Sequence, residues 1–283
     1  MAIFRPGDVS PQEIRDCLHE EIAQAIGPLN DLYRLPDSIF NDDNFHAVLT
    51  GFDMLVLKAL YDPALTSGMS RQAVAQRLPG ILDRLNPAGR SRQGDVLRPS
   101  PRQWINSIET ALGPRASDRQ RVEAARDAVR IAQAEGWRDS RYAFSLFVLG
   151  RLTLGTEPEL ALSAFLEAGS YFARTPGMQI QSAHVAMQLA AFALSAGQAD
   201  AAIDIVNAHL RDVADAENAA LLATLLFVKA EALDLENRPA EAREVRLDSL
   251  GWARYGFGSD EEVRARAAEI ATLNPRVRRG SGT

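Results

Sequence analysis

Apolar residues recur at helical spacing along most of this chain. In its first third, the pattern predicts a helix from Pro11 to Ile26 and a second from Phe45 to Tyr61, with a loop between them. The pairs Gly27–Pro28 and Asp62–Pro63 end these two helices, because proline cannot continue a helix. A third helix is predicted from the capping residue Ser70 towards Leu78. The chain is therefore predicted to be mainly helical.

The remainder of the chain is a succession of segments rich in Ala and Leu, for which we expect about eight helices between residues 101 and 273. Three segments, ELALSAFLEAG, ADAAIDIVNAH and PAEAREVRLDS, can be superimposed. Their alanines Ala161, Ala202 and Ala242 lie 41 and 40 residues apart. Each segment follows a helix that ends in a turn, so the predicted unit is a helix pair of about 40 residues. The predicted breaks fall at Gly136, 156–158, 175–177, Gly197, 214–217 and 237–239.

This arrangement resembles the tetratricopeptide repeat, in which small residues let paired helices approach closely. The residues near that family's small and aromatic positions are Leu149, Gly150, Ala161, Phe165, Ala168 and Pro176. The chain departs from the pattern at Arg246, where an aromatic residue is expected, and its spacing exceeds the usual repeat of about 34 residues. The resemblance implies an α-solenoid. An irregular helical domain without a true repeat is the alternative.

Composition indicates a globular protein without a nucleic-acid or membrane partner. Of its 283 residues 46% are hydrophobic, and 31 Lys and Arg face 37 Asp and Glu, which gives a net charge of -6. No apolar run is long enough to cross a membrane. The first ten residues lack the apolar segment of a secretory signal, which predicts a cytoplasmic protein as the sequence is written. If the natural N-terminus is longer, we expect an exported or periplasmic protein instead.

The first predicted helix carries polar residues at a spacing that has chemical meaning. Residues 20–30, EEIAQAIGPLN, follow the spacing of the HExxHxxGxxH motif of the metzincin zinc proteases. Glu20, Gln24 and Asn30 stand at the three histidine positions, and Glu21 stands at the catalytic glutamate. The segment thus resembles a metzincin helix in which every zinc-binding imidazole is replaced by a carboxylate or an amide.

Two further segments extend this resemblance over residues 17–61. Asp37–Phe40 resembles the tight turn that metzincins place beneath the metal, with Phe40 at the methionine position. Leu49–Asp53 and Leu60–Asp62 resemble the start and end of the closing helix of that fold. The ensemble, from HEEIAQAIGPLND through SIFNDDN to FDMLVLKALYDP, is similar to an uncharacterised bacterial family classed as a domain of unknown function.

These resemblances divide the chain into four parts. Residues 1–85 are predicted to form a degenerate metzincin-like domain, the C-terminal half of a zincin catalytic fold, and residues 86–101, NPAGRSRQGDVLRPSP, a linker. Tetratricopeptide-like repeats follow over residues 102–275, and a flexible tail over 276–283. A mainly α protein is expected, a solenoid preceded by a small, mostly helical remnant.

A metzincin places a twisted sheet before its active-site helix, and here that helix begins close to Met1. Ala2–Phe4 is interpreted as the last edge strand of that sheet. Either the sheet has been lost or the chain is truncated, and we favour truncation because the apolar stripe of the helix needs a partner layer. That stripe is predicted to comprise Ile14, Cys17, Leu18, Glu21, Ile22 and Ala25.

The substituted motif does not favour catalysis. Zinc prefers imidazole or thiolate ligands, whereas Glu20, Gln24 and Asn30 offer one charge and two neutral carbonyls. At best such a set holds a hard cation weakly, and it would not activate a water molecule for Glu21. We therefore expect no catalytic residue, metal or cofactor, with Glu21 vestigial. Gln24 and Asn30 are expected to bond each other or nearby backbone.

Other metal patterns are weaker. His19 begins an HExx pattern but has Ala23 one turn later, and the remaining histidines are scattered singly. The Asp-rich loop from Asp31 to Asp43 lacks the alternation and the terminal Glu of a calcium-binding loop, so capping and solvation are favoured there.

The favoured function is a non-catalytic protein-interaction module, whose helical array binds an unidentified protein or peptide. Arg141, Arg151 and Arg174 are candidates to receive carboxylates of that partner. Two alternatives are a metal-dependent peptidase with an unorthodox oxygen-ligand site and a structural protein that self-associates. Most large aromatic residues of the array are expected in its core.

Overall fold

The computed structural model describes residues 7–29, 32–41, 43, 45–91 and 98–280. Over these ranges it contains thirteen α-helices, one 3₁₀ helix and no β-strand, so the prediction of a mainly α protein is confirmed. Within the same ranges, none of the helices combines the length and the apolar content that a bilayer crossing requires. The proposed edge strand Ala2–Phe4 lies outside the described residues.

The chain divides into two compact units. Among the described residues, unit 1 comprises residues 16–99, and unit 2 comprises residues 7–15 together with 100–280. The division falls within helix α1 (Pro11–Ile26), whose bounds agree with the predicted helix. The first turn of this helix, which the sequence assigned to the N-terminal domain, is therefore counted with the helical array.

Unit 1 contains the rest of α1, followed by α2 (Gly51–Leu60), α3 (Arg71–Leu85) and the 3₁₀ helix η1 (Pro87–Ser91). Ser70 caps α3 as predicted, and this helix continues through Pro79 beyond the predicted end. Helix α2 starts later than the predicted Phe45, because Thr50 and Asp53 form a capping box that sets its first turn.

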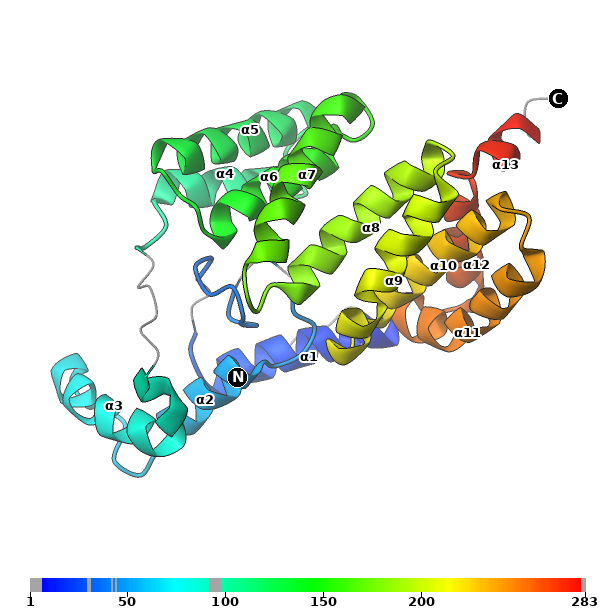
Figure 1. Cartoon of the computed structure of the whole chain (residues 1–283). Coiled ribbons are helices and arrows are strands. Elements are labelled where there is room, and N and C mark those ends of the chain that lie inside the picture. The colour runs from blue at the N-terminus through cyan, green and yellow to red at the C-terminus, as the bar shows by residue number, and fades with distance from the viewer. Residues whose placement is uncertain (1–6, 30–31, 42, 44, 92–97, 281–283) are drawn as a thin grey trace. The chain divides into compact units, whose positions relative to one another are not determined.

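Unit 2 contains a succession of helices over residues 102–271 in which each packs against the next along the chain (Figure 1). Each of the six predicted breaks coincides with a boundary between two helices, within one or two residues. Breaks after α4 and α11 were not predicted, so nine helices rather than about eight lie between residues 101 and 273. The helices are α4 (Arg102–Leu112), α5 (Asp118–Ala134), α6 (Ser140–Thr153), α7 (Pro158–Arg174), α8 (Gln179–Ser195), α9 (Ala199–Asp215), α10 (Ala219–Leu235), α11 (Pro239–Phe257), α12 (Asp260–Ala271) and α13 (Pro275–Gly280).

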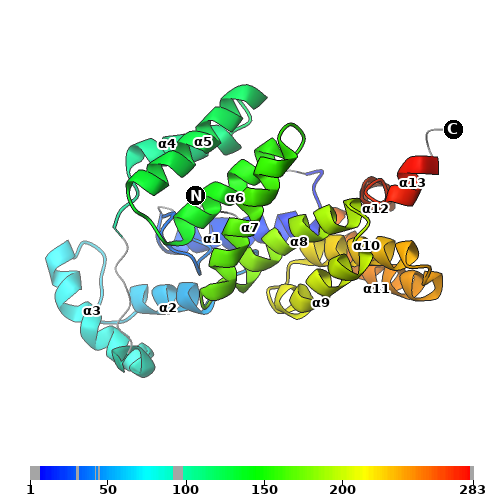
Figure 2. The same ribbon diagram turned by 45° about the horizontal axis from the view of Figure 1, so that its top comes forward.

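The helix starts in unit 2 follow the spacing found in the sequence. Helices α7, α9 and α11 begin at Pro158, Ala199 and Pro239, which are 41 and 40 residues apart. Contacts also join the alternate helices α8 and α10, and α10 and α12 (Figure 2). The turns recur at half of this spacing, two for each helix pair: the backbone is left-handed at Gly177, Gly197, Glu217 and Asn237, which are 20 residues apart, with φ of 83°, 78°, 54° and 61°.

Small residues set how closely the helices approach. A Cβ atom at Gly150 of α6 would lie 2.7 Å from the Phe165 ring of α7, so the aromatic ring packs directly on the glycine backbone. Ala161, Phe165 and Ala168 are fully buried along the same face of α7. Of the positions identified in the sequence, Gly150, Ala161, Phe165 and Ala168 are thus packing positions, whereas Pro176 is exposed.

At Arg246, α11 carries a charged side chain where the repeat pattern expects an aromatic residue. Its guanidinium pairs with Glu231 and with Asp234 of α10, at 2.6 Å in each case. Glu231 is buried and also accepts a hydrogen bond from Asn274 at 3.3 Å. A charged network therefore replaces an apolar contact at this helix crossing.

The end of the chain differs from the predicted flexible tail of residues 276–283. Residues 275–280 form α13, and the Asn274 side chain accepts a hydrogen bond from the backbone N–H of Arg276 at 3.0 Å. Arg278 donates to the backbone oxygens of Ser195 and Leu273, at 2.8 and 3.0 Å. These side-chain contacts hold α13 on the array, and residues 281–283 lie outside the described residues.

Two glycines of α11 provide a matched test of close helix packing. A Cβ atom at Gly256 would lie 2.5 Å from the backbone nitrogen of Ala220, whereas one at Gly251 would meet no atom within 4 Å. We expect Gly256→Ala to lower the free energy of unfolding by about 1–3 kcal/mol through overpacking. Gly251→Ala should raise it by about 0.5–1 kcal/mol. Urea unfolding measures both, and equal effects would contradict the close contact.

Candidate functional site

The polar residues of the predicted motif lie on neighbouring turns of α1. Gln24 Nε2 donates to Glu20 Oε1 at 3.5 Å, a contact that follows from their separation of four residues on one helix face. Both side chains are half-buried, as is Glu21. Asn30, the third predicted ligand position, lies outside the described residues. The expected contact between Gln24 and Asn30 therefore stays a prediction, beside the observed contact between Gln24 and Glu20.

The face of α1 that contacts the rest of unit 1 is the one that carries the motif. Ala23 is 2% exposed and forms a core cluster with Ile39 and Phe40. The predicted stripe is not the most buried face of the helix, because Ile22 is 45% exposed and its other members are only half-buried. Phe40 therefore lies against the helix at the level of Ala23.

A single buried carboxylate ties the predicted turn to α2. Asp53 is fully buried and accepts hydrogen bonds from Ser38 Oγ at 2.5 Å and from the backbone N–H groups of Ile39 at 3.0 Å and Thr50 at 2.8 Å. The same Asp53 closes the capping box of α2 with Thr50. A charged acceptor with several donors makes strong hydrogen bonds in a buried setting, so this contact fixes the turn on the helix.

The ends of α1 and α2 also meet. Tyr61 Oη donates to the backbone oxygen of Ile26 at 2.8 Å. A Cβ atom at Gly27 would lie 2.7 Å from both the Ala23 carbonyl oxygen and Leu57 Cδ2, so glycine lets the end of α1 approach Leu57 without displacing either group. The conformations of the predicted turn and closing helix are therefore coupled to the end of the helix that carries the motif.

The other predicted metal-binding patterns remain separate within the described ranges. No three residues of the types His, Cys, Asp and Glu gather there at metal-binding distances. His46 Nε2 lies 3.1 Å from the backbone oxygen of Pro36, and the His184 ring packs edge-on against Phe147 at 6.4 Å. Asp31, Asp42 and Asn44 of the Asp-rich loop lie outside the described residues.

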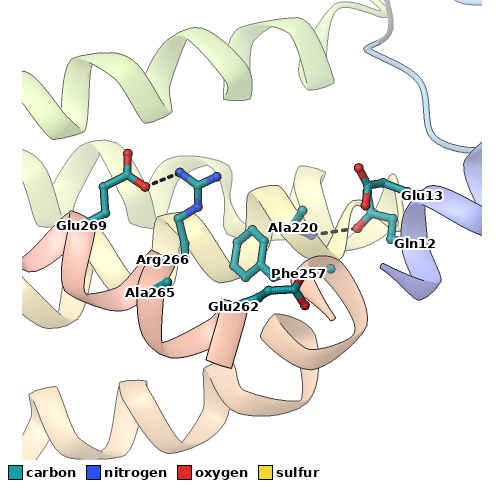
Figure 3. Close-up of a pocket in the computed structure, with 9 residues that line it drawn as sticks. Gln12, Glu13, Ala220, Phe257, Glu262, Ala265, Arg266 and Glu269 are labelled. Carbon is teal, nitrogen blue, oxygen red and sulfur yellow. Dashed lines mark hydrogen bonds and ion pairs between the residues drawn. The ribbon is translucent and has the colours of Figure 1, made fainter. Parts of the chain in front are cut away.

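A second region of interest lies in unit 2, where the first turn of α1 docks on the array (Figure 3). Gln12 is buried; its Oε1 accepts from the backbone N–H of Ala220 at 2.8 Å, and its Nε2 donates to Asn218 Oδ1 at 3.1 Å. Arg15 donates to the backbone oxygen of Glu217 at 2.8 Å and stands 5.5 Å from the Tyr255 ring. These contacts satisfy groups at the N-terminus of α10.

A cavity of about 520 Å³ lies beside this docked segment. Figure 3 shows the Phe257 ring between Arg266 and the hydrogen bond from Ala220 to Gln12. The carboxylates of the cavity have internal partners. Glu13 accepts a hydrogen bond from the backbone N–H of Ser10, and Glu262 accepts one from the backbone N–H of Ser259, as glutamates do in capping boxes. Glu269 accepts a hydrogen bond from the Arg266 guanidinium and forms a surface ion pair with it. The Ser259 backbone N–H lowers the pKa of Glu262. The cavity is therefore a structural junction.

Sequence reasoning did not find this junction. A local signal was present in the Ser10-x-x-Glu13 pattern, which is a capping box and marks the start of α1. Its partner surface, formed by Asn218 and Ala220, is more than 200 residues away. No local pattern indicates such a contact.

The three arginines proposed to receive carboxylates have different surroundings. Arg141 is 2% exposed and pairs with Asp139 at 2.5 Å. Its guanidinium also stacks 3.7 Å from the Trp137 ring centroid. Because these contacts lie inside the protein, Arg141 has a structural role and does not face a partner. Arg151 lies 5.9 Å from the Phe147 ring centroid. Arg174 is exposed and lines a cavity formed by α5, α6 and α7.

Comparison with known proteins concerns the N-terminal part of the chain. A model of the family described as "Protein of unknown function (DUF2927)" matches residues 1–80. No curated protein and no solved structure matches the chain. The matched residues include the motif of α1, the Ser38–Phe40 turn and α2. The expected similarity of this region to an uncharacterised domain-of-unknown-function family is therefore confirmed.

The Asp53 contact predicts a large effect from a small chemical change. Asp53→Asn replaces one acceptor oxygen by an NH₂ group that faces donors, which should destabilise unit 1 by about 1–3 kcal/mol. Hydrogen exchange at the Ile39 and Thr50 amides should accelerate accordingly. Asp37→Asn is the matched control, because the side chain of Asp37 is 57% exposed. Equal exchange in the two variants would show that the buried carboxylate does not hold the turn.

Proposed function

We propose that this chain is a non-catalytic protein-interaction module. In this proposal, unit 1 contains a remnant of a metzincin-like fold, and unit 2 is a tetratricopeptide-like array that binds a protein or peptide segment. The observation that carries the proposal is the regular succession of helices, in which alternate helices start about 40 residues apart and left-handed turns recur every 20 residues. Such helix pairs present extended surfaces, which suit peptides better than small-molecule turnover.

The geometry of unit 1 supports the remnant interpretation. The turn at Phe40 packs on the motif-bearing helix at Ala23, and Asp53 connects that turn to α2. These are the three segments on which the metzincin resemblance rests, and they contact one another. The proposal therefore treats them as the retained core of an active-site scaffold.

The chemistry of the motif supports loss of catalysis. Glu20 and Gln24 provide one carboxylate and one amide, a donor set that suits zinc poorly. Their side chains also form a hydrogen bond with each other at 3.5 Å. Glu21 therefore has no zinc-activated water to deprotonate in this proposal.

Zinc binding and peptidase activity test the non-catalytic part. We expect the full chain to retain no stoichiometric zinc after dialysis and to leave casein uncleaved. The triple variant Glu20→His, Gln24→His and Asn30→His should gain zinc, because it restores imidazoles at all three ligand positions. Elemental analysis and a fluorogenic casein assay make the measurement. Stoichiometric metal in the native chain, with cleavage that Glu21→Gln abolishes, would establish a peptidase instead.

Peptide selection tests the interaction part. A phage library of random dodecapeptides is selected on the immobilised full chain, and enriched peptides are resynthesised with a photo-cross-linker. We expect them to attach to helices of unit 2, as mapped by mass spectrometry. Enrichment no greater than on a blank support, or attachment confined to residues 16–80, would refute the assignment of the binding surface to the array.

A further inference from the structure

Helices α5, α6 and α7 and the loop between α5 and α6 line an open cavity of about 390 Å³ in unit 2. It differs in chemistry from the junction beside α1. Its lining combines aromatic rings with two guanidinium groups. The lining residues are Gln133, Gly136, Trp137, Arg138, Tyr142, Glu167, Tyr171 and Arg174. This volume falls in the range of small ligand pockets and suits one or two side chains of a partner.

The Trp137 wall of the cavity is held in place from behind. Trp104 packs edge-on against Trp137 with ring centroids 5.4 Å apart, and Arg141 stacks over it at 3.7 Å. Trp104 is itself fully buried, and its Nε1 donates to Ser145 Oγ at 3.0 Å. The ring is therefore pre-organised, so a partner would lose little entropy in ordering it.

The carboxylate of the cavity is already engaged. Tyr142 Oη donates to Glu167 Oε1 at 2.6 Å and accepts from Gln133 Nε2 at 3.4 Å. Burial and the bond to Glu167 raise the pKa of Tyr142, which keeps the phenol protonated and donating at neutral pH. The negative charge of Glu167 is thus partly satisfied by its own wall.

The two cations of the cavity are less engaged. In the part of the chain that the structure describes, Arg138 makes no hydrogen bond or ion pair. Arg174 bonds the backbone oxygen of Ser170 through Nε at 2.8 Å, which leaves its two terminal nitrogens without a partner there. Both arginines are exposed at the cavity. With one engaged carboxylate and two available guanidiniums, the site favours an anion.

We propose that this cavity binds the carboxylate side chains of an acidic peptide segment, with Arg138 and Arg174 as the charge-bearing contacts and Trp137 and Tyr171 as walls for an adjacent apolar side chain. This inference rests on the proposed function and names the partner's chemistry. Guanidinium groups pair with carboxylates in bidentate geometry, and aromatic walls contact an apolar neighbour. A free inorganic anion would leave those walls uncovered.

Fluorescence anisotropy with defined peptides tests the proposal on the full chain. The probe is a fluorescein-labelled hexapeptide of alternating Glu and Phe, compared with the same peptide carrying Gln in place of Glu. The variants are Arg138→Glu and Arg174→Glu. The matched control is Arg211→Glu on α9, where the native side chain is 92% exposed and the charge change is the same. Circular dichroism melts check that each variant folds.

We expect the acidic peptide to bind the native chain and the Arg211→Glu variant equally. Each charge reversal in the cavity should weaken binding by about ten-fold or more, and the Gln peptide should bind similarly weakly. Binding that is unchanged in Arg138→Glu and Arg174→Glu, absent from the native chain, or as tight for the Gln peptide would overturn the proposal. The proposal would also be overturned if inorganic phosphate displaced the peptide equally well from the native chain and from the two arginine variants.

The outcomes separate the cavity from the function on which it rests. If the acidic peptide does not bind but library selection still enriches peptides that attach to unit 2, the cavity assignment is refuted and the interaction module is retained. If selection also enriches no peptide, the cavity assignment and the interaction module are both refuted. If the selected peptides are acidic and lose binding in Arg174→Glu, both are supported.

Discussion

Close packing of helices on alanine and glycine is the constraint on which both units depend. In unit 2, the Phe165 ring lies on the backbone of Gly150, and the end of α11 approaches the start of α10 at Gly256. In unit 1, Ala23 packs on Phe40, and Gly27 lets Leu57 approach the end of α1. Because any added atom at these glycines would meet a neighbour, small side chains determine how near the helices come.

Polar side chains then define where the helices begin and how their ends are joined. Asp53 both caps α2 and holds the Ser38–Phe40 turn, so a local capping signal also serves a tertiary contact. Asn218 caps α10 and accepts from Gln12 of the docked N-terminal turn. In both cases one side-chain oxygen accepts hydrogen bonds from donors of two separate segments. Burial of these polar side chains is tolerated because their acceptor oxygens are hydrogen-bonded.

The three polar regions differ in how much of their hydrogen-bonding capacity the protein itself uses. In the cavity beside α1, the carboxylates are occupied by backbone donors and Arg266, which is the pattern of a structural junction. In α1 itself, Gln24 donates a hydrogen bond to Glu20 at 3.5 Å, so the two motif residues are also partners of each other. Around Trp137, two exposed guanidiniums lie beside preformed aromatic walls. That contrast is why the binding proposal centres on the third region.

The sequence by itself determined the local structure: the bounds of α1, the Ser70 cap, six helix breaks and the 40-residue spacing all follow from residues close in the chain. Periodicity and capping act over one or two turns, so such signals are readable without a fold. The late start of α2 shows the limit, because apolar residues between 45 and 50 have helical spacing, whereas the capping box of Thr50 and Asp53 starts the helix at Gly51.

Only the tertiary structure decided which side chains meet. Arg141 and Arg174 are both arginines on helices, yet one is buried against Trp137 and the other lines a cavity. The contact of Gln12 with the start of α10 joins residues more than 200 positions apart. No local pattern in the sequence indicates the ion pair between Arg246 and Glu231 either. Such contacts depend on helix orientation and packing distance, which arise from the sum of many small interactions across the fold and leave no pattern in any one segment.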